Sequence, residues 1–241
     1  MIPIFQLVAL CFLIVSIYTN SFKNGKFTCK NFLLNAYLYI FLSFLSISIL
    51  IDTYIHFRVP TIFETIKTRG FVGFLMILIP SLILLWATMA ISPELVIIKH
   101  TAWFAYIAFT AYILYPLAKY APRIFTESKL ITFVIMSLLT AATFMFPQYI
   151  KLSWVSTLTT VLLGLIVIRL IDFIIPFSST MHYWLSYIGL LLFSFFLLYD
   201  TKKLIVKAKQ CIRADYVNDS MGVFLDGLNI FLEIFSLRGR R

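Results

Sequence analysis

The sequence predicts an all-α fold, a polytopic membrane helix bundle, with six transmembrane helices around or beside a central acidic seventh helix and an extra apolar N-terminal segment. The chain of 241 residues is 61% hydrophobic and only 12% charged, with a mean hydropathy of +0.97. About a quarter of the residues in a soluble domain are charged. The apolar residues form stretches of the roughly twenty residues that a helix needs to cross about 30 Å of hydrocarbon. A membrane barrel would instead show ten-residue stretches of alternating polarity.

The chain begins with an apolar segment, residues 2–18. It lacks the basic start and the small-residue cleavage site of a signal peptide, so we expect an uncleaved span or a membrane-embedded segment. Residues 19–30 form a polar link with three lysines. We therefore divide the chain into this N-terminal segment and link (1–30), a seven-helix membrane domain (31–236) and a basic tail (237–241).

Six further apolar stretches predict the transmembrane helices. Because lipid offers no hydrogen bonds to the backbone, each stretch is expected to be helical. Pro80 and Pro116 lie inside two of them and are expected to kink the helices there. The stretches are residues 31–55, 70–91, 98–118, 129–147, 152–176 and 182–199.

The seventh segment, residues 216–236, is apolar but carries Asp219, Asp226 and Glu233 at intervals of seven residues. Seven residues are almost two helical turns, so these acids form one stripe along the helix. Such a helix should face other helices or a water-filled path. It either crosses the membrane or re-enters from one side.

The basic residues favour one orientation. With a crossing seventh helix, lysine and arginine divide evenly between the two sides, whereas a re-entrant helix places more of them on the side of residues 19–30. The positive-inside rule then puts that side in the cytoplasm. The basic hairpin that follows the sixth helix points the same way; its residues are Lys202, Lys203, Lys207, Lys209 and Arg213.

The net charge of +10 is spread over short loops. These charges are expected to contact lipid headgroups rather than nucleic acid, because no soluble segment is long enough for a nucleic-acid-binding domain. Cys11, Cys29 and Cys211 have no metal-binding spacing, and their odd number argues against a disulfide framework. Cys211 beside the membrane has the context of a palmitoylation site.

Asp200 and Asp226 lie on consecutive predicted helices joined by the basic hairpin. An aspartate in hydrocarbon is costly and indicates a functional site with a partner. Two carboxylates held close in a low dielectric cannot both stay ionised, so they would titrate as a unit. One shared proton would tie the two helices, and its loss would separate them or admit a hard cation such as Ca²⁺. Alternatively, Asp200 ends its helix and pairs with Lys202 or Lys203, while Asp226 bonds a hydroxyl or amide.

The other polar residues suggest structural roles. Asp219 is expected to cap the start of the seventh helix, Glu233 to pair with Arg238, and Arg169 with Asp172 three residues later. His56, His100 and His182 are isolated in the sequence, and no metal-binding, nucleotide-binding or nucleophile motif is present.

The C-terminal sequence resembles the transmembrane Bax inhibitor motif family. The resemblance rests on LLYDTKKLIVKAKQ and DYVNDSMGVFLDGLNIFLEI between Phe195 and Ile234, with Pro116 and the segment Thr140–Phe144 as weaker matches. Tyr115 stands where the family usually has glycine. The spans from about 31 to 236 agree with the family in number and order.

The resemblance implies a pH-sensitive Ca²⁺ leak that modulates an intracellular store and inhibits apoptosis, latched by Asp200 and Asp226. In bacterial relatives an arginine of helix 2 competes for the latch, and Arg69 is the nearest residue here. No enzyme activity and no cofactor are expected, and Ca²⁺ is the permeant ion. The expected partners are membrane lipids and cell-death regulatory membrane proteins.

The expected location is the endoplasmic reticulum or Golgi membrane, in a host cell if the chain is viral. The Arg238-Gly239-Arg240 sequence could act as a retention signal. Two other functions stay open. One is a non-conducting interaction protein that regulates cell-death partners. The other, more remote, is an intramembrane aspartyl protease, although Phe224 and Leu225 precede Asp226 where that class needs a GxGD motif.

Overall fold

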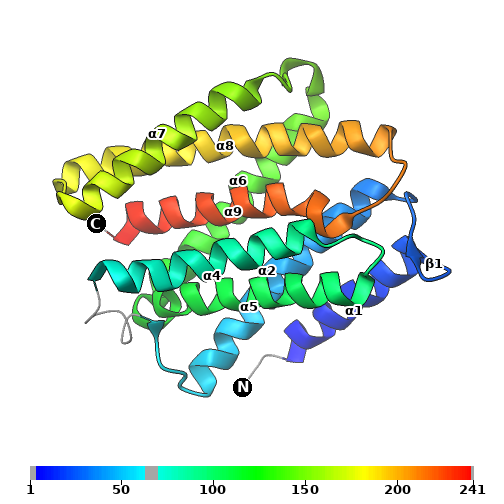
Figure 1. The fold of residues 1–241 in the computed structure, drawn as a ribbon, viewed down its shortest axis with the longest axis horizontal. Coiled ribbons are helices and arrows are strands. Elements are labelled where there is room, and N and C mark those ends of the chain that lie inside the picture. The colour runs from blue at the N-terminus through cyan, green and yellow to red at the C-terminus, as the bar shows by residue number, and fades with distance from the viewer. Residues whose placement is uncertain (1–3, 63–69, 240–241) are drawn as a thin grey trace. The chain divides into compact units, whose positions relative to one another are not determined.

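A computed structural model describes residues 4–62 and 70–239, and it confirms an all-α membrane fold. Helices account for 84% of it, and seven of those in the described ranges are long and apolar enough to cross a membrane. Figure 1 shows the order of the elements. They are α1 (Ile4–Ser21), β1 (Phe22–Lys23), β2 (Lys26–Phe27), α2 (Phe32–His56), α4 (Gly70–Ala90), α5 (Val96–Tyr120), α6 (Pro122–Met145), the 3₁₀ turn η1 (Pro147–Tyr149), α7 (Trp154–Ile174), α8 (Ser179–Lys209) and α9 (Tyr216–Gly239).

The predicted spans match these helices, with two extensions. α6 begins at Pro122 rather than near residue 129, since proline is favoured in the first turn of a helix. α8 continues to Lys209 because residues 200–209 keep a helical pattern of apolar positions beyond the predicted span. Pro80 and Pro116 lie inside α4 and α5.

The chain divides into two compact units. The first comprises the chain up to Pro122 together with Gln210–Met221, and the second comprises Arg123–Lys209 together with the chain from Gly222. In the first unit α1 packs on α2, and both α2 and α4 pack on α5. Residues 24–25 turn the β1–β2 hairpin, and both have positive φ values, as the Asn-Gly sequence of a type I′ turn favours.

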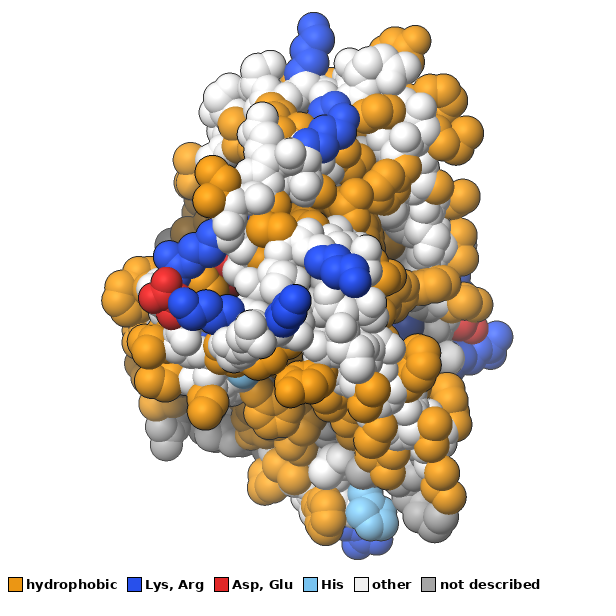
Figure 2. Space-filling model, turned by 90° about the vertical axis from the view of Figure 1, so that its right-hand side faces the viewer, with side chains coloured by type: hydrophobic (Ala, Val, Ile, Leu, Met, Phe, Trp, Pro, Cys, Tyr) orange, Lys and Arg blue, Asp and Glu red, His pale blue; other side chains and the backbone are white. Residues whose placement is uncertain are grey.

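The second unit joins α6, α7 and α8 to most of α9. Leu158 and Leu165 of α7 pack with Leu185 and Leu192 of α8, and the rings of Phe125 and Phe231 place α6 against α9. The remaining surfaces of these helices are largely apolar, as expected of side chains that face lipid. Figure 2 shows hydrophobic side chains spread over one face of the molecule, with several lysines and arginines among them.

α9 is the most buried of the candidate spans, with 61% of its apolar 18-residue stretch buried, compared with 6–50% for the others. Its 24 residues form one continuous helix, about 36 Å long at 1.5 Å per residue. This length suits a helix that crosses the membrane rather than one that re-enters it.

Candidate functional site

α8 and α9 run antiparallel in the second unit and place small and polar residues opposite each other. Ser186 donates a hydrogen bond of 3.1 Å to Ser236. Three residues further along α8, Gly189 faces Glu233, which lies three residues back along α9. Small residues at such contacts let membrane helices approach closely.

Two glycines in this interface make room for carboxylates of the facing helix. A Cβ atom on Gly222 of α9 would lie 2.7 Å from Cγ of Asp200, and a Cβ atom on Gly189 of α8 would lie 2.7 Å from Cδ of Glu233. Real Cβ atoms do not approach other atoms this closely. Each helix therefore accommodates an acidic side chain of the other only because glycine stands opposite it.

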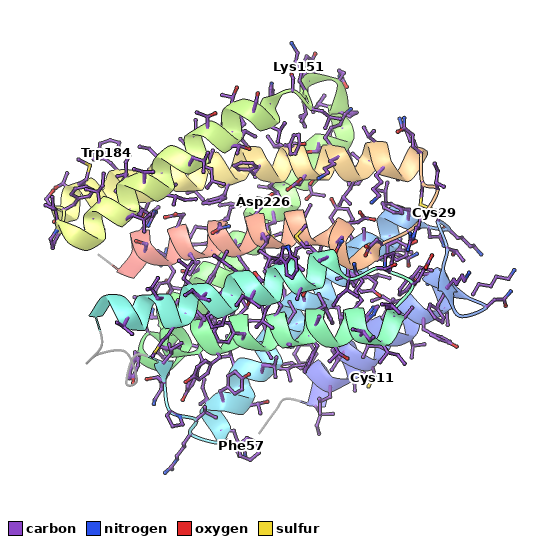
Figure 3. The ribbon with its side chains drawn as sticks, viewed as in Figure 1. Cys11, Cys29, Phe57, Lys151, Trp184 and Asp226 are labelled. Carbon is purple, nitrogen blue, oxygen red and sulfur yellow. A yellow bond between two sulfur atoms is a disulfide. The ribbon has the colours of Figure 1, made fainter. Side chains whose placement is uncertain are left out.

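Asp200 and Asp226 have their side chains within hydrogen-bonding reach of each other. Asp226 is labelled on α9 in Figure 3; it is 6% exposed, and its Oδ2 has no hydrogen-bond partner among the described residues. Asp200 is half-buried. The structure thus brings together the two aspartates that the sequence analysis singled out.

The alternative position of Asp200 at a helix end is wrong, because α8 continues for nine residues beyond it. Lys202 points elsewhere and donates a hydrogen bond of 2.8 Å to the carbonyl oxygen of Pro147. Lys203 interacts electrostatically with Asp200 from one turn away, without forming a salt bridge among those found in the described chain.

The chemistry of this contact depends on a proton. Two ionised carboxylates are both acceptors, so a hydrogen bond between them requires that one carries a proton. Without the proton, two negative charges face each other in a medium of low dielectric, where their repulsion is large. The pair therefore has two states of different energy that a single proton interconverts.

Glu233 is paired differently from the prediction. Its two oxygens accept hydrogen bonds of 2.6 and 2.7 Å from Nη2 of Arg169. The expected pair of Arg169 with Asp172 is wrong, because the long arginine side chain reaches across to α9. Asp172 instead accepts a hydrogen bond of 2.9 Å from the backbone N–H of Phe177 and lies 3.3 Å from Nε2 of His182, so this histidine is not isolated.

The expected pair of Glu233 with Arg238 is also wrong. Arg238 forms a salt bridge with Glu127 of α6, which additionally accepts a hydrogen bond of 3.0 Å from Arg123 one turn earlier. Because α6 begins at Pro122, it carries Glu127 alongside the end of α9. The acidic residues of α9 therefore have separate partners.

The start of α9 lies in the first unit and is organised by Asp215, which the sequence analysis did not single out. Its Oδ1 accepts a hydrogen bond of 3.2 Å from the backbone N–H of Asn218, as an N-cap does. Its Oδ2 accepts one of 2.8 Å from Lys99, whose side chain is only 1% exposed. Asp219 lies in the first helical turn, as predicted, and accepts a weak hydrogen bond from the backbone N–H of Asp215.

Cys29 and Cys211 form a disulfide bond, so the expectation against disulfides and the palmitoylation site at Cys211 are wrong. The two residues are 182 positions apart, and no local spacing links them. The fold of the first unit brings the connector after α8 beside the link before α2, where Figure 3 shows the yellow bond at Cys29. Cys11 remains a free, exposed cysteine on α1.

The basic hairpin is mainly helix. Lys202, Lys203, Lys207 and Lys209 belong to α8, while Arg213 in the connector bonds Ser92 at 2.7 Å and lies 3.3 Å from Glu94. The expectations for Arg69 and for Arg240 lie outside the described residues.

The described part of the chain shows no group of three or more His, Cys, Asp or Glu side chains that could hold a metal ion. Among these described residues, Asp200 and Asp226 offer a cation two carboxyl groups and no third acidic or imidazole ligand. A Ca²⁺ ion takes six to eight oxygen ligands, so the pair by itself is too small a donor set for a resident ion.

Comparison with known proteins agrees with the arrangement of helices. A family model described as inhibitor of apoptosis-promoting Bax1 matches residues 29–241, which leaves only α1 and the β1–β2 hairpin outside the match. No curated protein sequence matches the chain. The apolar helices and this match identify an integral, multi-pass membrane protein linked to the inhibition of apoptosis. The chain belongs to the Bax inhibitor family.

Proposed function

We propose that the protein is a pH-sensitive Ca²⁺ leak in the membrane of an intracellular store, and that it restrains apoptosis by lowering the calcium content of that store. The contact between Asp200 and Asp226 carries the proposal. Buried Asp226 has an oxygen, Oδ2, without a hydrogen-bond partner among the described residues. A buried acceptor left unpaired is costly, so its presence at this position favours a role beyond packing.

The pair acts as a latch between α8 and α9. With one shared proton, a hydrogen bond holds the two helices together at this point. When the proton leaves as the pH rises, repulsion between the carboxylates weakens the contact, and the negative charge attracts cations. Ca²⁺ flux should therefore increase with rising pH through the titration of the pair.

The small number of carboxylate ligands suits an ion leak better than a site that holds a resident ion. Conduction requires a site that binds a cation strongly enough to admit it and weakly enough to release it. Two carboxylates supplemented by water meet this requirement, whereas a complete cage of six to eight oxygens would retain Ca²⁺.

The disulfide supports an orientation opposite to the one that the basic residues favour. Disulfides persist in oxidising compartments and are rare in the cytosol. The link before α2 and the connector before α9, joined by Cys29 and Cys211, would then face the lumen of the store. If α9 crosses the membrane from that side, its end at Arg238 would lie in the cytosol, where a retention signal is read.

Calcium flux through liposomes that contain the purified protein tests the proposal. Asp226→Asn and Asp200→Asn each keep the shape of the side chain but remove one titrating group. The amide can donate to the remaining carboxylate, so both variants should stay latched and show low flux at every pH from about 5 to 8. Asp172→Asn is the matched control, because Asp172 is a carboxylate of the same unit with different partners, and it should retain the wild-type pH profile.

The same experiment separates the alternative function. If wild-type protein conducts no better than empty liposomes while cells that express it remain protected, the chain acts on cell-death partners without conducting. If it conducts and both variants keep the wild-type pH profile, the latch is refuted.

A further inference from the structure

The polar face of α9 continues beyond Asp226 to a second buried carboxylate. Asp226, Asn229, Glu233 and Ser236 follow at intervals of three, four and three residues, so they lie on one face of the helix. Glu233 is seven residues beyond Asp226, about 10 Å along the axis. A cation that moved along this face from the aspartates would therefore pass Asn229 and meet Glu233 as the next carboxylate.

Glu233 occupies a site built for a charged side chain. It is 6% exposed, and Gly189 of α8 leaves room for its carboxylate. Ser186 lies one turn away on α8 and donates its hydroxyl proton to Ser236. Arg169 contacts both of its oxygens from α7. All five residues belong to the second unit.

Arg169 brings a guanidinium group, a positively charged fork of N–H donors, to the carboxylate of Glu233. Its side chain is 43% exposed, although Glu233 is buried. Arg169 thus reaches the buried carboxylate of Glu233 from α7, a helix whose side chains are mostly exposed. Its guanidinium group occupies the position that a mobile cation would take at the carboxylate.

We propose that the Arg169–Glu233 ion pair is a second gate, in series with the Asp200–Asp226 latch, in which Arg169 is a tethered cation that a passing divalent cation must displace. This inference rests on the proposed leak function. It assigns the two acidic sites different tasks: the aspartate pair binds a proton, whereas the ion pair obstructs the path with the guanidinium group of Arg169.

A gate and a purely structural ion pair predict different changes in Ca²⁺ flux when the charge of Arg169 or of Glu233 is removed. Arg169→Gln leaves a free carboxylate in the path, so Ca²⁺ flux should rise severalfold at pH 8, when the latch is open. Glu233→Gln leaves an unpaired positive charge there, so flux should fall severalfold. A purely structural ion pair would make both variants change flux in the same direction, because both would lose the same contact.

The double variant Arg169→Gln/Glu233→Gln decides the matter if either single variant fails to fold. It removes both charges together, so that no unpaired charge is left at the buried site, which is what makes the loss of a single partner strongly destabilising. Without the tethered cation, the double variant should conduct more than wild type. Arg123→Gln is the control, since Arg123 pairs with Glu127 on the surface of α6 with 92% of its side chain exposed, and its flux should equal that of wild type.

The test measures Ca²⁺ flux into liposomes at pH 6 and pH 8 for each variant. Circular dichroism and gel filtration in detergent check that each variant is folded. Opposite changes in the single variants, with the pH dependence retained, support the gate. Changes of the same sign, or a double variant equal to wild type, overturn the gate while leaving the leak intact. A wild-type protein that does not conduct overturns the leak function, and the gate with it.

Discussion

Replacing Gly222 by alanine should shift the pH dependence of Ca²⁺ flux by disturbing the aspartate contact without altering either carboxyl group. The new Cβ atom would lie 2.7 Å from Cγ of Asp200, so Asp200 must move away. Such overpacking costs about 1–3 kcal/mol, and the higher helix propensity of alanine recovers about 1 kcal/mol. The net loss of folding stability is therefore small, at about 0–2 kcal/mol.

The effect on the latch should be easier to measure. A hydrogen bond to a charged group contributes about 1.5–3 kcal/mol, and a change of 1.36 kcal/mol corresponds to one pH unit. Because the shared hydrogen bond exists only in the protonated state, weakening it favours the open state. The pH of half-maximal flux should fall by about 1–2 units.

Gly164→Ala provides the matched control. Gly164 also lies inside a helix of the second unit, but a Cβ atom there meets nothing within 4 Å. Its variant should have the wild-type pH profile and equal or greater thermal stability. If Gly222→Ala and Gly164→Ala have the same pH of half-maximal flux, the contact between the aspartates does not set the pH dependence.

Two further predictions concern the first unit. An intramolecular disulfide makes a protein migrate differently on reducing and non-reducing gels. Cys29→Ser should abolish this difference, whereas Cys11→Ser should keep it. A difference that persists in Cys29→Ser would contradict the pairing of Cys29 with Cys211. Lys99→Met removes the buried partner of Asp215 and should destabilise the protein by about 3–5 kcal/mol, measured by thermal unfolding in detergent. Arg213→Ala removes an exposed contact and should cost no more than about 1 kcal/mol, so equal losses in the two variants would argue against a special role for the buried pair.

The transmembrane helices could be predicted from the sequence because hydrocarbon thickness imposes a length on each apolar stretch. The acidic stripe of α9 was also visible, since residues seven apart share a helical face. Asp200 and Asp226 could be identified as candidate site residues for a similar local reason, because a charged side chain within apolar membrane sequence is energetically costly. These features depend on composition and on spacing within one helix, and both are present in the linear chain.

The partners of the charged residues depended on the tertiary structure. Sequence proximity suggested pairs within one helix for Arg169 and Glu233, yet Arg169 bonds Glu233 across 64 positions, and Lys99 bonds Asp215 across 116. Cys29 and Cys211 meet in the same way across 182 positions. Helical spacing constrains only neighbours three or four residues apart, whereas long side chains in a bundle bond whatever packing brings beside them. The sequence by itself determined which helices form and where their charges lie, and the packing of those helices decided which charges meet.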